Sequence, residues 1–395
     1  MKLAVLAAAD PFNVRTWSGT PHYMTRALQA KFPDLLPVRV PRPVWVQHLR
    51  RVVRKGTGGR IDLFWNRLLA SRNAYALADR LLAAHVDVAL CIGNAPISAF
   101  LSERLPTVHV SDATVPLMRH YYAEFSCLPK ILADSAWQLD RMSVLRSRAC
   151  LFSTEWAARS AVRDYGADPT RVHAVPWGAN IDSQDISSDN PVRAADCCHL
   201  VFIGVDWNRK GGDIAVAAAK QLLAAGRAVK FHIIGAKPQL SQNDGDIIFH
   251  GFVNKGTHEG RCNFDRIMTN AAFLFVPTRQ DCYGMVFPEA NSYGVPVITT
   301  RTGGVPDVVH EGINGHLLPI EASAEAYADL IWAIWSDRRR YDSLRKSSRS
   351  RFDQALNWNS WLSAAAPVIE GAARGLTVVA ADGRPTPVQA HADID

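Results

Sequence analysis

The chain has 395 residues, more than one hydrophobic core usually organises, so two domains of roughly 150–200 residues are expected. Hydrophobic residues make up 48% and charged residues 21%, which argues against a disordered chain, and no apolar run approaches the roughly 20 residues of a membrane-spanning helix. The seven cysteines include no Cys-x-x-Cys pair, which argues against a disulfide framework and favours a reducing cytoplasm.

The first half alternates short apolar runs with helical patterns, a rhythm typical of βαβ units and parallel sheets. The N-terminal run MKLAVLAAAD is too short for a signal sequence, and we expect it to be the first strand. The strands expected in this half are Lys2–Ala7, Val86–Ile92, Thr107–Val110, Ala149–Phe152 and Arg171–Val175. The pattern predicts a first α/β domain over residues 1–182.

In the first half, the turn Trp17-Ser-Gly19-Thr20-Pro21-His22 follows the first strand and precedes a helical run. A glycine at a helix N-terminus presents backbone N–H groups that can bind an anion. Gly19 is therefore a candidate phosphate contact. An ordinary helix cap with proline in the first turn would require the same residues, and that alternative stays open.

A strongly basic segment, residues 39–80, lies in this first domain. The net charge of the chain is +7, and ten basic residues stand here against Asp62 and Asp79. The segment is either a solvated helical face or a contact for an anionic membrane surface or an acidic acceptor. It lacks regular aromatic interleaving and any nucleic-acid-binding motif, so nucleic acid is not an expected partner. We expect a cytoplasmic protein, free or peripheral to the inner face of the membrane.

The second half starts after a polar, proline-containing stretch at residues 183–196, which we predict is a linker. The expected strands are Cys198–Ile203, Lys230–Ile234, Ile247–Phe249, Ala272–Val276 and Pro296–Thr299, and helical patterns follow through Glu321–Leu344. The pattern predicts a second α/β domain over residues 197–356. A final segment, residues 357–376, is expected to dock back on the first domain, and residues 377–395 form a mobile tail.

Two acids follow one strand of the second half, in Asp281-Cys-Tyr-Gly-Met-Val-Phe-Pro-Glu289. A strand, a loop with one acid and a helix with a second acid place both carboxylates at the carboxyl end of a parallel sheet, where open α/β folds bind ligands. Carboxylates accept hydrogen bonds from vicinal diols, so the ribose and hexose of a nucleotide sugar are suitable ligands. The alternative is that Glu289 only complements a helix N-terminus.

A basic step follows another strand. Gly204 ends the apolar run Cys198–Ile203, and Arg209 and Lys210 come shortly before an Ala/Val-rich helix. Adjacent cations can neutralise a diphosphate whose charge grows as the sugar–phosphate bond breaks, and a glycine lets the backbone approach that group. Arg209 and Lys210 are the candidates for leaving-group stabilisation. The alternative is an exposed basic turn that caps a helix.

These motifs, with Gly294-Val-Pro-Val after Glu289, resemble the family-4 retaining glycosyltransferases. The resemblance runs from about Lys2 to Leu362 and is strongest from Val201 to Leu318. It implies an α/β GT-B fold, in which two Rossmann-like domains face a central cleft. It also implies that Glu289 holds the donor ribose, while the transferred sugar meets Asp281 and the backbone of Tyr283, Gly284 and Met285. The chain departs from the family at Asp281, where glutamate is common. It also departs at Val205, which stands where the family often has an arginine, and Arg209 is expected to take the place of that arginine.

The resemblance assigns roles to three further places. Gly251 and Phe252, at the end of a strand, correspond to the nucleobase pocket. Gly19 corresponds to a loop that covers the donor phosphates from the first domain. Asp112, and after it His109, correspond to residues that orient the acceptor, although Ser111 replaces the usual histidine. A purely structural role is the alternative for both.

Together these features predict a metal-independent, retaining glycosyltransferase of the hexosyltransferase type, with no cofactor. Its partners would be a nucleotide-sugar donor and an unknown glycan, lipid-linked or small-molecule acceptor. The sequence Asp244-Gly245-Asp246 resembles a metal-binding triplet, but its polar setting favours a solvent turn. Two alternatives remain: a non-hydrolysing nucleotide-sugar epimerase of the same fold, and a non-catalytic nucleotide-sugar-binding protein.

Overall fold

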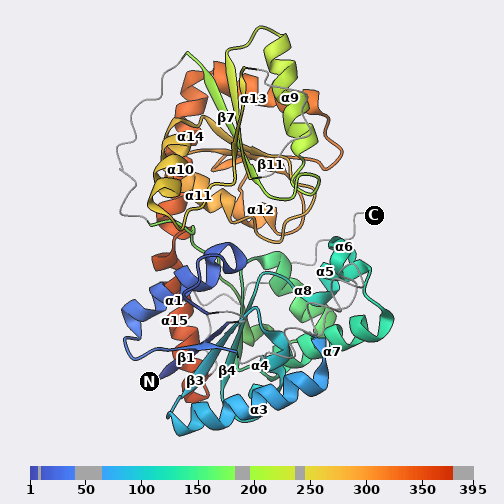
Figure 1. The fold of residues 1–395 in the computed structure, drawn as a ribbon, viewed down its shortest axis with the longest axis vertical. Helices are drawn as coiled ribbons and strands as arrows, with labels where there is room; N and C mark the ends of the chain where they lie inside the picture. The colour runs from blue at the N-terminus through green and yellow to red at the C-terminus, as the bar shows by residue number, and fades with distance from the viewer. Residues whose placement is uncertain (8–9, 41–64, 183–195, 236–244, 377–395) are drawn as a thin grey trace. The chain divides into compact units, whose positions relative to one another are not determined.

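The computed structural model describes residues 1–7, 10–40, 65–182, 196–235 and 245–376 (Figure 1). The predictions for residues 41–64 of the basic segment, residues 183–195 of the linker and the tail at residues 377–395 lie outside the described residues. The chain divides into two compact units. The first unit is Met1–Pro176 together with the residues from Trp361 onward, and the second is Trp177–Ser360.

The first unit is built on a parallel sheet of six strands in the order β2-β1-β3-β4-β5-β6. The strands are β1 (Leu3–Ala7), β2 (Leu36–Arg39), β3 (Val88–Ile92), β4 (Thr107–Ser111), β5 (Ala149–Phe152) and β6 (Val172–Ala174). The helices are α1 (Thr20–Lys31), α3 (Arg67–Ala83), α4 (Ala95–Leu101), α5 (Val115–Tyr121), α6 (Ala123–Ser126), α7 (Lys130–Arg146) and α8 (Glu155–Tyr165). The order in which strands are added reverses between β1 and β3, because β2 lies on one side of β1 and the later strands lie on the other.

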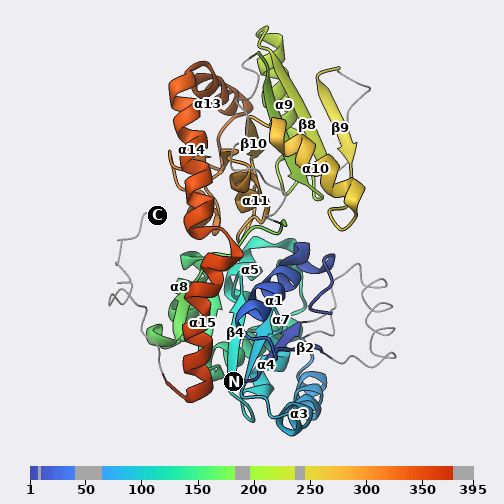
Figure 2. The same cartoon turned by 90° about the vertical axis from the view of Figure 1, so that its left-hand side faces the viewer.

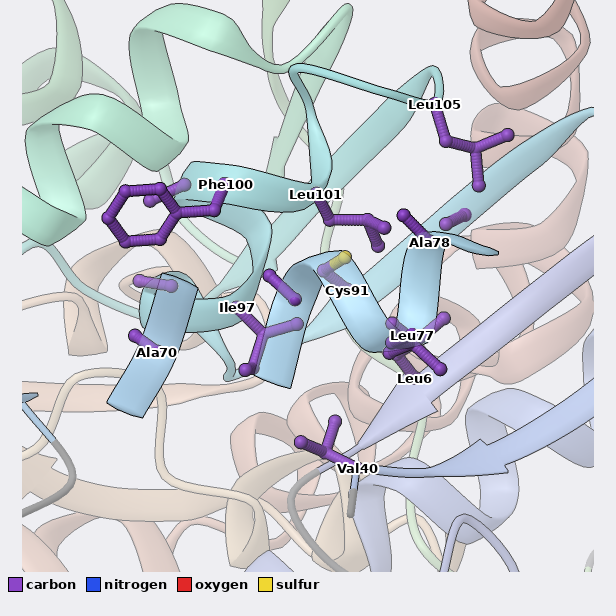
Figure 3. Close-up of a cluster of buried hydrophobic side chains, with 14 of the residues drawn as sticks. Leu6, Val40, Ala70, Leu77, Ala78, Cys91, Ile97, Phe100, Leu101 and Leu105 are labelled. Carbon is purple, nitrogen blue, oxygen red and sulfur yellow. The ribbon is translucent and has the colours of Figure 1, made fainter. Parts of the chain in front are cut away.

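The first unit has a core of small and branched apolar side chains between its sheet and its helices (Figure 3). Leu6 of β1 and Cys91 of β3 meet side chains from α3 and α4, among them Leu77, Phe100 and Leu101. The strand β3 reads Val-Ala-Leu-Cys-Ile and is buried along its whole length. An uninterrupted apolar run is typical of a parallel strand that is covered on both faces.

The second unit repeats this architecture with the strand order β12-β11-β10-β7-β8-β9, again all parallel. The strands are β7 (Cys198–Gly204), β8 (Val229–Gly235), β9 (Ile247–Gly251), β10 (Phe273–Val276), β11 (Val297–Thr300) and β12 (Gly315–Leu318). The helices are α9 (Gly212–Ala224), α10 (His258–Asn270), α11 (Val286–Ser292), α12 (Val305–Val308), α13 (Ala324–Ser336) and α14 (Arg338–Ala355). In this sheet the strand order reverses between β7 and β10.

Side-chain caps fix where several of these helices begin. Thr257 accepts from the Gly260 N–H at the start of α10, and Ser323 accepts from the Ala326 N–H at the start of α13. Asp337 separates α13 from α14 and accepts from the Arg340 N–H. Such caps satisfy N–H groups that have no partner inside the helix.

The last described helix, α15 (Trp358–Arg374), begins in the second unit and belongs to the first from Trp361 onward. Within the first unit it lies beside α1, where Glu370 pairs with Lys31 at 3.2 Å (Figures 1 and 2). None of the helices in the described ranges has the length and apolar character needed to span a bilayer.

Candidate functional site

The two predicted cations and the first predicted acid lie together at the point where the strand order of the second sheet reverses. Arg209 and Lys210 follow β7, Asp281 follows β10, and these two strands are neighbours. In open parallel sheets, the carboxyl ends of the two strands that flank such a point form the crevice in which ligands bind. The topology therefore places three predicted site residues at the favoured position for a ligand.

The three side chains form a compact charged cluster. The Lys210 ammonium donates to one Asp281 carboxylate oxygen at 2.6 Å, and the Arg209 guanidinium contacts the other at 3.4 Å. Arg209 also donates to the Gln280 carbonyl at 2.8 Å. Lys210 and Asp281 are both buried, which is rare for charged side chains unless they are paired.

Glycines bring the backbone close enough for this cluster to form. Gly211 has φ +71°, and a Cβ there would lie 2.0 Å from the Pro277 carbonyl oxygen after β10. Gly204, a predicted donor contact, lies against the Lys210 stem, since a Cβ there would lie 2.8 Å from Lys210 Cγ. The backbone at Gly211 is thus packed on the backbone at Pro277, and a side chain at Gly211 would push the two loops apart.

A second ion pair supports the same loops from outside. Arg279 forms a bidentate pair with Asp213 of α9 at 2.8 and 2.7 Å, and it also donates to the Asn208 carbonyl at 2.5 Å. The Arg279 N–H donates to the Arg209 carbonyl at 2.8 Å. Neither Arg279 nor Asp213 was predicted, because a charged pair formed across 66 positions of the chain leaves no local sequence pattern.

Glu289, the second predicted acid, lies in the first turn of α11 and is buried. Its carboxylate pairs with the ammonium group of Lys255, from the turn between β9 and α10. Burial raises the pKa of Glu289, and the Lys255 charge opposes that rise. The sequence analysis missed Lys255, which is separated from Glu289 by 34 positions.

The backbone segment predicted to meet the transferred sugar leads into α11. Tyr283 is buried, and its hydroxyl donates to the Trp177 carbonyl while the two rings lie 5.6 Å apart. Gly284 has φ +78°, and a Cβ there would lie 2.2 Å from the Phe287 ring. Met285 is the cap residue of α11. The side chain of Tyr283 therefore has a packing role, which leaves its backbone as the part available to a ligand.

The predicted nucleobase residues lie at the end of β9. Gly251 has φ +69° with open space around it, and Phe252 is 74% exposed. Next to them, His199, His232 and His250 stack across β7, β8 and β9 with ring nitrogens 3.0 Å apart at both steps. Burial, with its two imidazole neighbours, lowers the pKa of His232 to about 4. Within the described ranges, no group of three or more His, Cys, Asp and Glu side chains is arranged to hold a metal ion.

Gly19 lies in the first unit, in the turn that follows β1. Gly19 has φ +87° and is the N-cap of α1, and the preceding Trp17 and Ser18 also have positive φ, at 46° and 56°. Trp17 packs on Gly93 after β3, where a Cβ would lie 2.6 Å from its ring. The turn thus lies at the point where the strand order of the first sheet reverses. Strained backbone of this kind is concentrated at functional sites.

The two predicted acceptor residues are treated differently by the fold. His109 is the third residue of β4, 1% exposed, and its Nδ1 pairs with the Ser143 hydroxyl of α7 at 2.9 Å. Burial lowers the pKa of His109 to about 4. His109 lies inside the predicted strand Thr107–Val110, and β4, which continues to Ser111, encloses it in the core. Asp112 follows the strand and is half-buried.

Comparison with known families decides what kind of chain carries these residues. Residues 198–337 match the family model described as Glycosyl transferases group 1. This part of the chain is therefore similar to the group 1 glycosyl transferases. The match contains Arg209, Lys210, Lys255, Asp281 and Glu289.

Curated relatives carry a related description. The D-inositol 3-phosphate glycosyltransferase of Nocardia farcinica is 26% identical over 315 residues, which is 73% of this chain and 67% of that protein. The protein of the same name from Xylanimonas cellulosilytica is 27% identical over 253 residues, 58% of this chain and 57% of that protein. The alignments thus span between about half and two thirds of the length of these relatives.

Solved structures share the whole architecture. Sucrose-phosphate synthase from Thermosynechococcus elongatus has a TM-score of 0.69 at 15% identity and covers 94% of this chain and 98% of its own. HepE from Anabaena, in complex with UDP and glucose, has a TM-score of 0.64 at 14% identity, with 94% and 99% covered. WaaG, a glycosyltransferase involved in lipopolysaccharide biosynthesis, has 0.63 at 14%, with 93% and 100% covered. These similarities and the two parallel sheets confirm the predicted α/β GT-B fold.

Proposed function

We propose that this chain is a glycosyltransferase that moves a hexose from a nucleotide diphosphate sugar to a hydroxyl acceptor, with retention at the anomeric carbon and without a metal. The single observation that carries the proposal is the cluster of Arg209, Lys210 and Asp281 at the point where the strand order of the second sheet reverses. The match of residues 198–337 to the family model of the group 1 glycosyl transferases supports it. So do the solved structures of HepE in complex with UDP and with UDP-glucose.

The chemistry of donor cleavage needs cations beside the leaving group. When the sugar–phosphate bond breaks, the departing nucleotide diphosphate gains negative charge, and pre-positioned cations stabilise that charge without reorganising. Lys210 and Arg209 would supply this stabilisation, with Asp281 holding both in place before the donor arrives. Arg209 also pairs with Asp206 at 3.5 Å, so an incoming diphosphate would compete with two carboxylates for the two cations.

Recognition of the rest of the donor would fall to residues around this cluster. Glu289 would accept hydrogen bonds from the ribose hydroxyls, and the turn at Gly251 and Phe252 would receive the base. The backbone of Tyr283, Gly284 and Met285 would meet the transferred sugar. Gly19 of the first unit would contribute backbone N–H groups to the donor phosphates, and Asp112 would orient the acceptor.

Two points concern the acceptor. The curated relatives are named for D-inositol 3-phosphate, so a phosphorylated polyol is the first acceptor to test. The basic residues of segment 39–80 would suit either such an anionic acceptor or an anionic membrane surface that presents a lipid-linked one.

The decisive experiment begins with a thermal-shift screen of UDP-, GDP- and ADP-linked sugars, since a ligand that binds the folded state raises its apparent stability. The donor that shifts the transition is then incubated with inositol phosphate, glycan and lipid-linked acceptors, with and without a chelator. Sugar transfer with an unchanged anomeric configuration, undiminished by the chelator, is the expected result. Formation of an epimeric nucleotide sugar, or binding without any turnover, would instead identify an epimerase or a binding protein.

A further inference from the structure

Lys255 is held in one position by three different contacts. Its ammonium group pairs with the Glu289 carboxylate, lies 3.4 Å from the Asn180 carbonyl oxygen, and stands 5.1 Å from the centre of the Phe264 ring. These partners come from α11, from the segment before the linker and from α10. Holding a lysine in one position costs side-chain entropy that a solvated lysine keeps. Three contacts that hold it therefore indicate a defined role.

The Glu289 carboxylate depends on that ammonium group. Its side chain is only 3% exposed, whereas that of Lys255 is 30% exposed, so the pair has a buried anion and a partly solvated cation. Burial of a carboxylate without a positive partner favours its protonated form, which donates through its O–H and accepts fewer hydrogen bonds from a diol. The pairing thus decides whether Glu289 is chemically able to receive sugar hydroxyls.

The other charged groups on the surrounding helices have different partners. Asp265 of α10 accepts from the Tyr293 hydroxyl of α11, and Arg349 of α14 donates to the Ser292 carbonyl and to Asp353. Arg351 of α14 contacts the His310 ring nitrogen at 3.4 Å. Among the described residues, Lys255 is therefore the cation that acts on this carboxylate.

We propose that Lys255 is a positioning residue of the donor site, which binds one oxygen of the Glu289 carboxylate and supplies the charge that lets the other oxygen receive a ribose diol. The inference rests on the proposed function, because it takes Glu289 as the ribose contact. It adds a residue to that site and makes nucleotide recognition a property of the Lys255–Glu289 pair.

The test measures binding of UDP, GDP and ADP by calorimetry to the full chain, followed by the 2′,3′-dideoxy form of the nucleotide that binds best. The variants are Lys255→Met, which keeps an unbranched side chain without the ammonium group, Lys255→Arg, which keeps the charge, Glu289→Gln and the double variant. Lys255→Met is expected to bind the ribonucleotide about 10- to 100-fold more weakly, with most of this affinity recovered in Lys255→Arg. The dideoxy nucleotide should bind wild type and Lys255→Met equally.

The pH profile gives a readout that a merely structural lysine would not change. Without the Lys255 charge, burial acts unopposed and raises the pKa of Glu289 further, so the carboxylate ionises only at higher pH. The affinity of Lys255→Met should therefore rise toward that of wild type as the pH is raised, while the wild-type profile stays flatter. In Glu289→Gln, adding Lys255→Met should cost no further affinity.

The failures of the two proposals can be told apart. If wild type binds none of the three nucleotides, the proposed function is wrong. If wild type binds but Lys255→Met has the same affinity and the same pH profile, or binds more tightly, the role of Lys255 is overturned while the donor site stands. If Lys255→Met unfolds, the comparison of Glu289→Gln with the double variant decides, since an added loss there would also overturn it.

Discussion

The two units treat their buried carboxylates in opposite ways. In the first unit Asp140 of α7 is 3% exposed and accepts from neutral donors, the Tyr165 hydroxyl at 2.7 Å and the Val115 N–H at 2.9 Å. Burial raises the pKa of Asp140 to about 6. In the second unit Asp281 and Glu289 are each paired with a lysine ammonium group.

This difference separates a structural acid from a candidate functional one. The donors around Asp140 complete a hydrogen-bonding arrangement inside one unit and hold no charge that a ligand could use. The cations beside Asp281 and Glu289 can instead be shared with a phosphate or a hydroxyl that enters later. Because both sheets have the same parallel topology, the fold fixes where a ligand would bind, and the charges decide which unit binds its phosphates.

The largest expected effect is that of Lys210→Ala on turnover. If Lys210 stabilises the leaving diphosphate, its loss should lower kcat by about 100- to 1000-fold while the donor affinity changes much less, because the charge it meets grows only as the bond breaks. Steady-state kinetics with the donor found in the screen measure both quantities. The exposed Lys346→Ala of α14 is the matched control and should behave as wild type. Equal losses in kcat and donor affinity would contradict the assignment.

The contrast with Asp140 can be tested through the pH dependence of stability. The folded-state pKa of about 6 lies above the unfolded value, so the folded state retains this proton more tightly and stability falls as pH rises from about 4 to about 7. The contribution over this window is about 3 kcal/mol in the free energy of unfolding. Asp140→Asn should remove that slope and leave turnover unchanged. Denaturant unfolding of both proteins across the window checks the first point, and a loss of turnover would mean that Asp140 does more than support the fold.

Backbone proximity in the second unit can be separated from backbone conformation by a pair of glycines. Gly211 and Gly226 have nearly the same φ, +71° and +69°, but only Gly211 lies against another backbone segment. Gly226→Ala should cost about 1 kcal/mol of unfolding free energy from the left-handed conformation alone. Gly211→Ala should cost about 3 kcal/mol, because its Cβ meets the Pro277 carbonyl. It should also lower turnover by separating Lys210 from Asp281. Equal costs in thermal unfolding would show that the loops are not held together at this point.

The fold was largely readable from the sequence because its central strands are uninterrupted apolar runs. The two strands that the analysis missed, β2 and β12, are both at sheet edges and have mixed patterns. The first is Leu-Pro-Val-Arg, and a proline disfavours a strand assignment although an edge tolerates it. The second is Gly-His-Leu-Leu, which starts inside a glycine-rich turn. Edge strands need less apolar surface, so they leave a weaker pattern.

The candidate site was readable only where its residues are close in the sequence. The acid pair and the Arg-Lys step follow strands directly, and the rule for carboxyl ends of parallel strands brings them together. Lys255 lies in a polar turn whose local sequence gives no indication of a buried acid on another helix. His109 was named from a partial motif match, and that match carries no information on its burial in the core beside Ser143.

The smallest expected effect concerns the turn of the first unit, which offers backbone groups in place of charge. Gly19 and Gly166 both have positive φ, +87° and +71°, and alanine at either should cost about 1 kcal/mol of unfolding free energy. Gly19 lies in the turn after β1, where the strand order reverses, whereas Gly166 ends α8 with open space around it. If the Gly19 turn contacts the donor phosphates, Gly19→Ala alone should weaken nucleotide binding by about fivefold, or roughly 1 kcal/mol. Calorimetric titration of both variants distinguishes the two roles, since equal affinities would leave Gly19 as a helix cap and assign donor binding to the charges of the second unit.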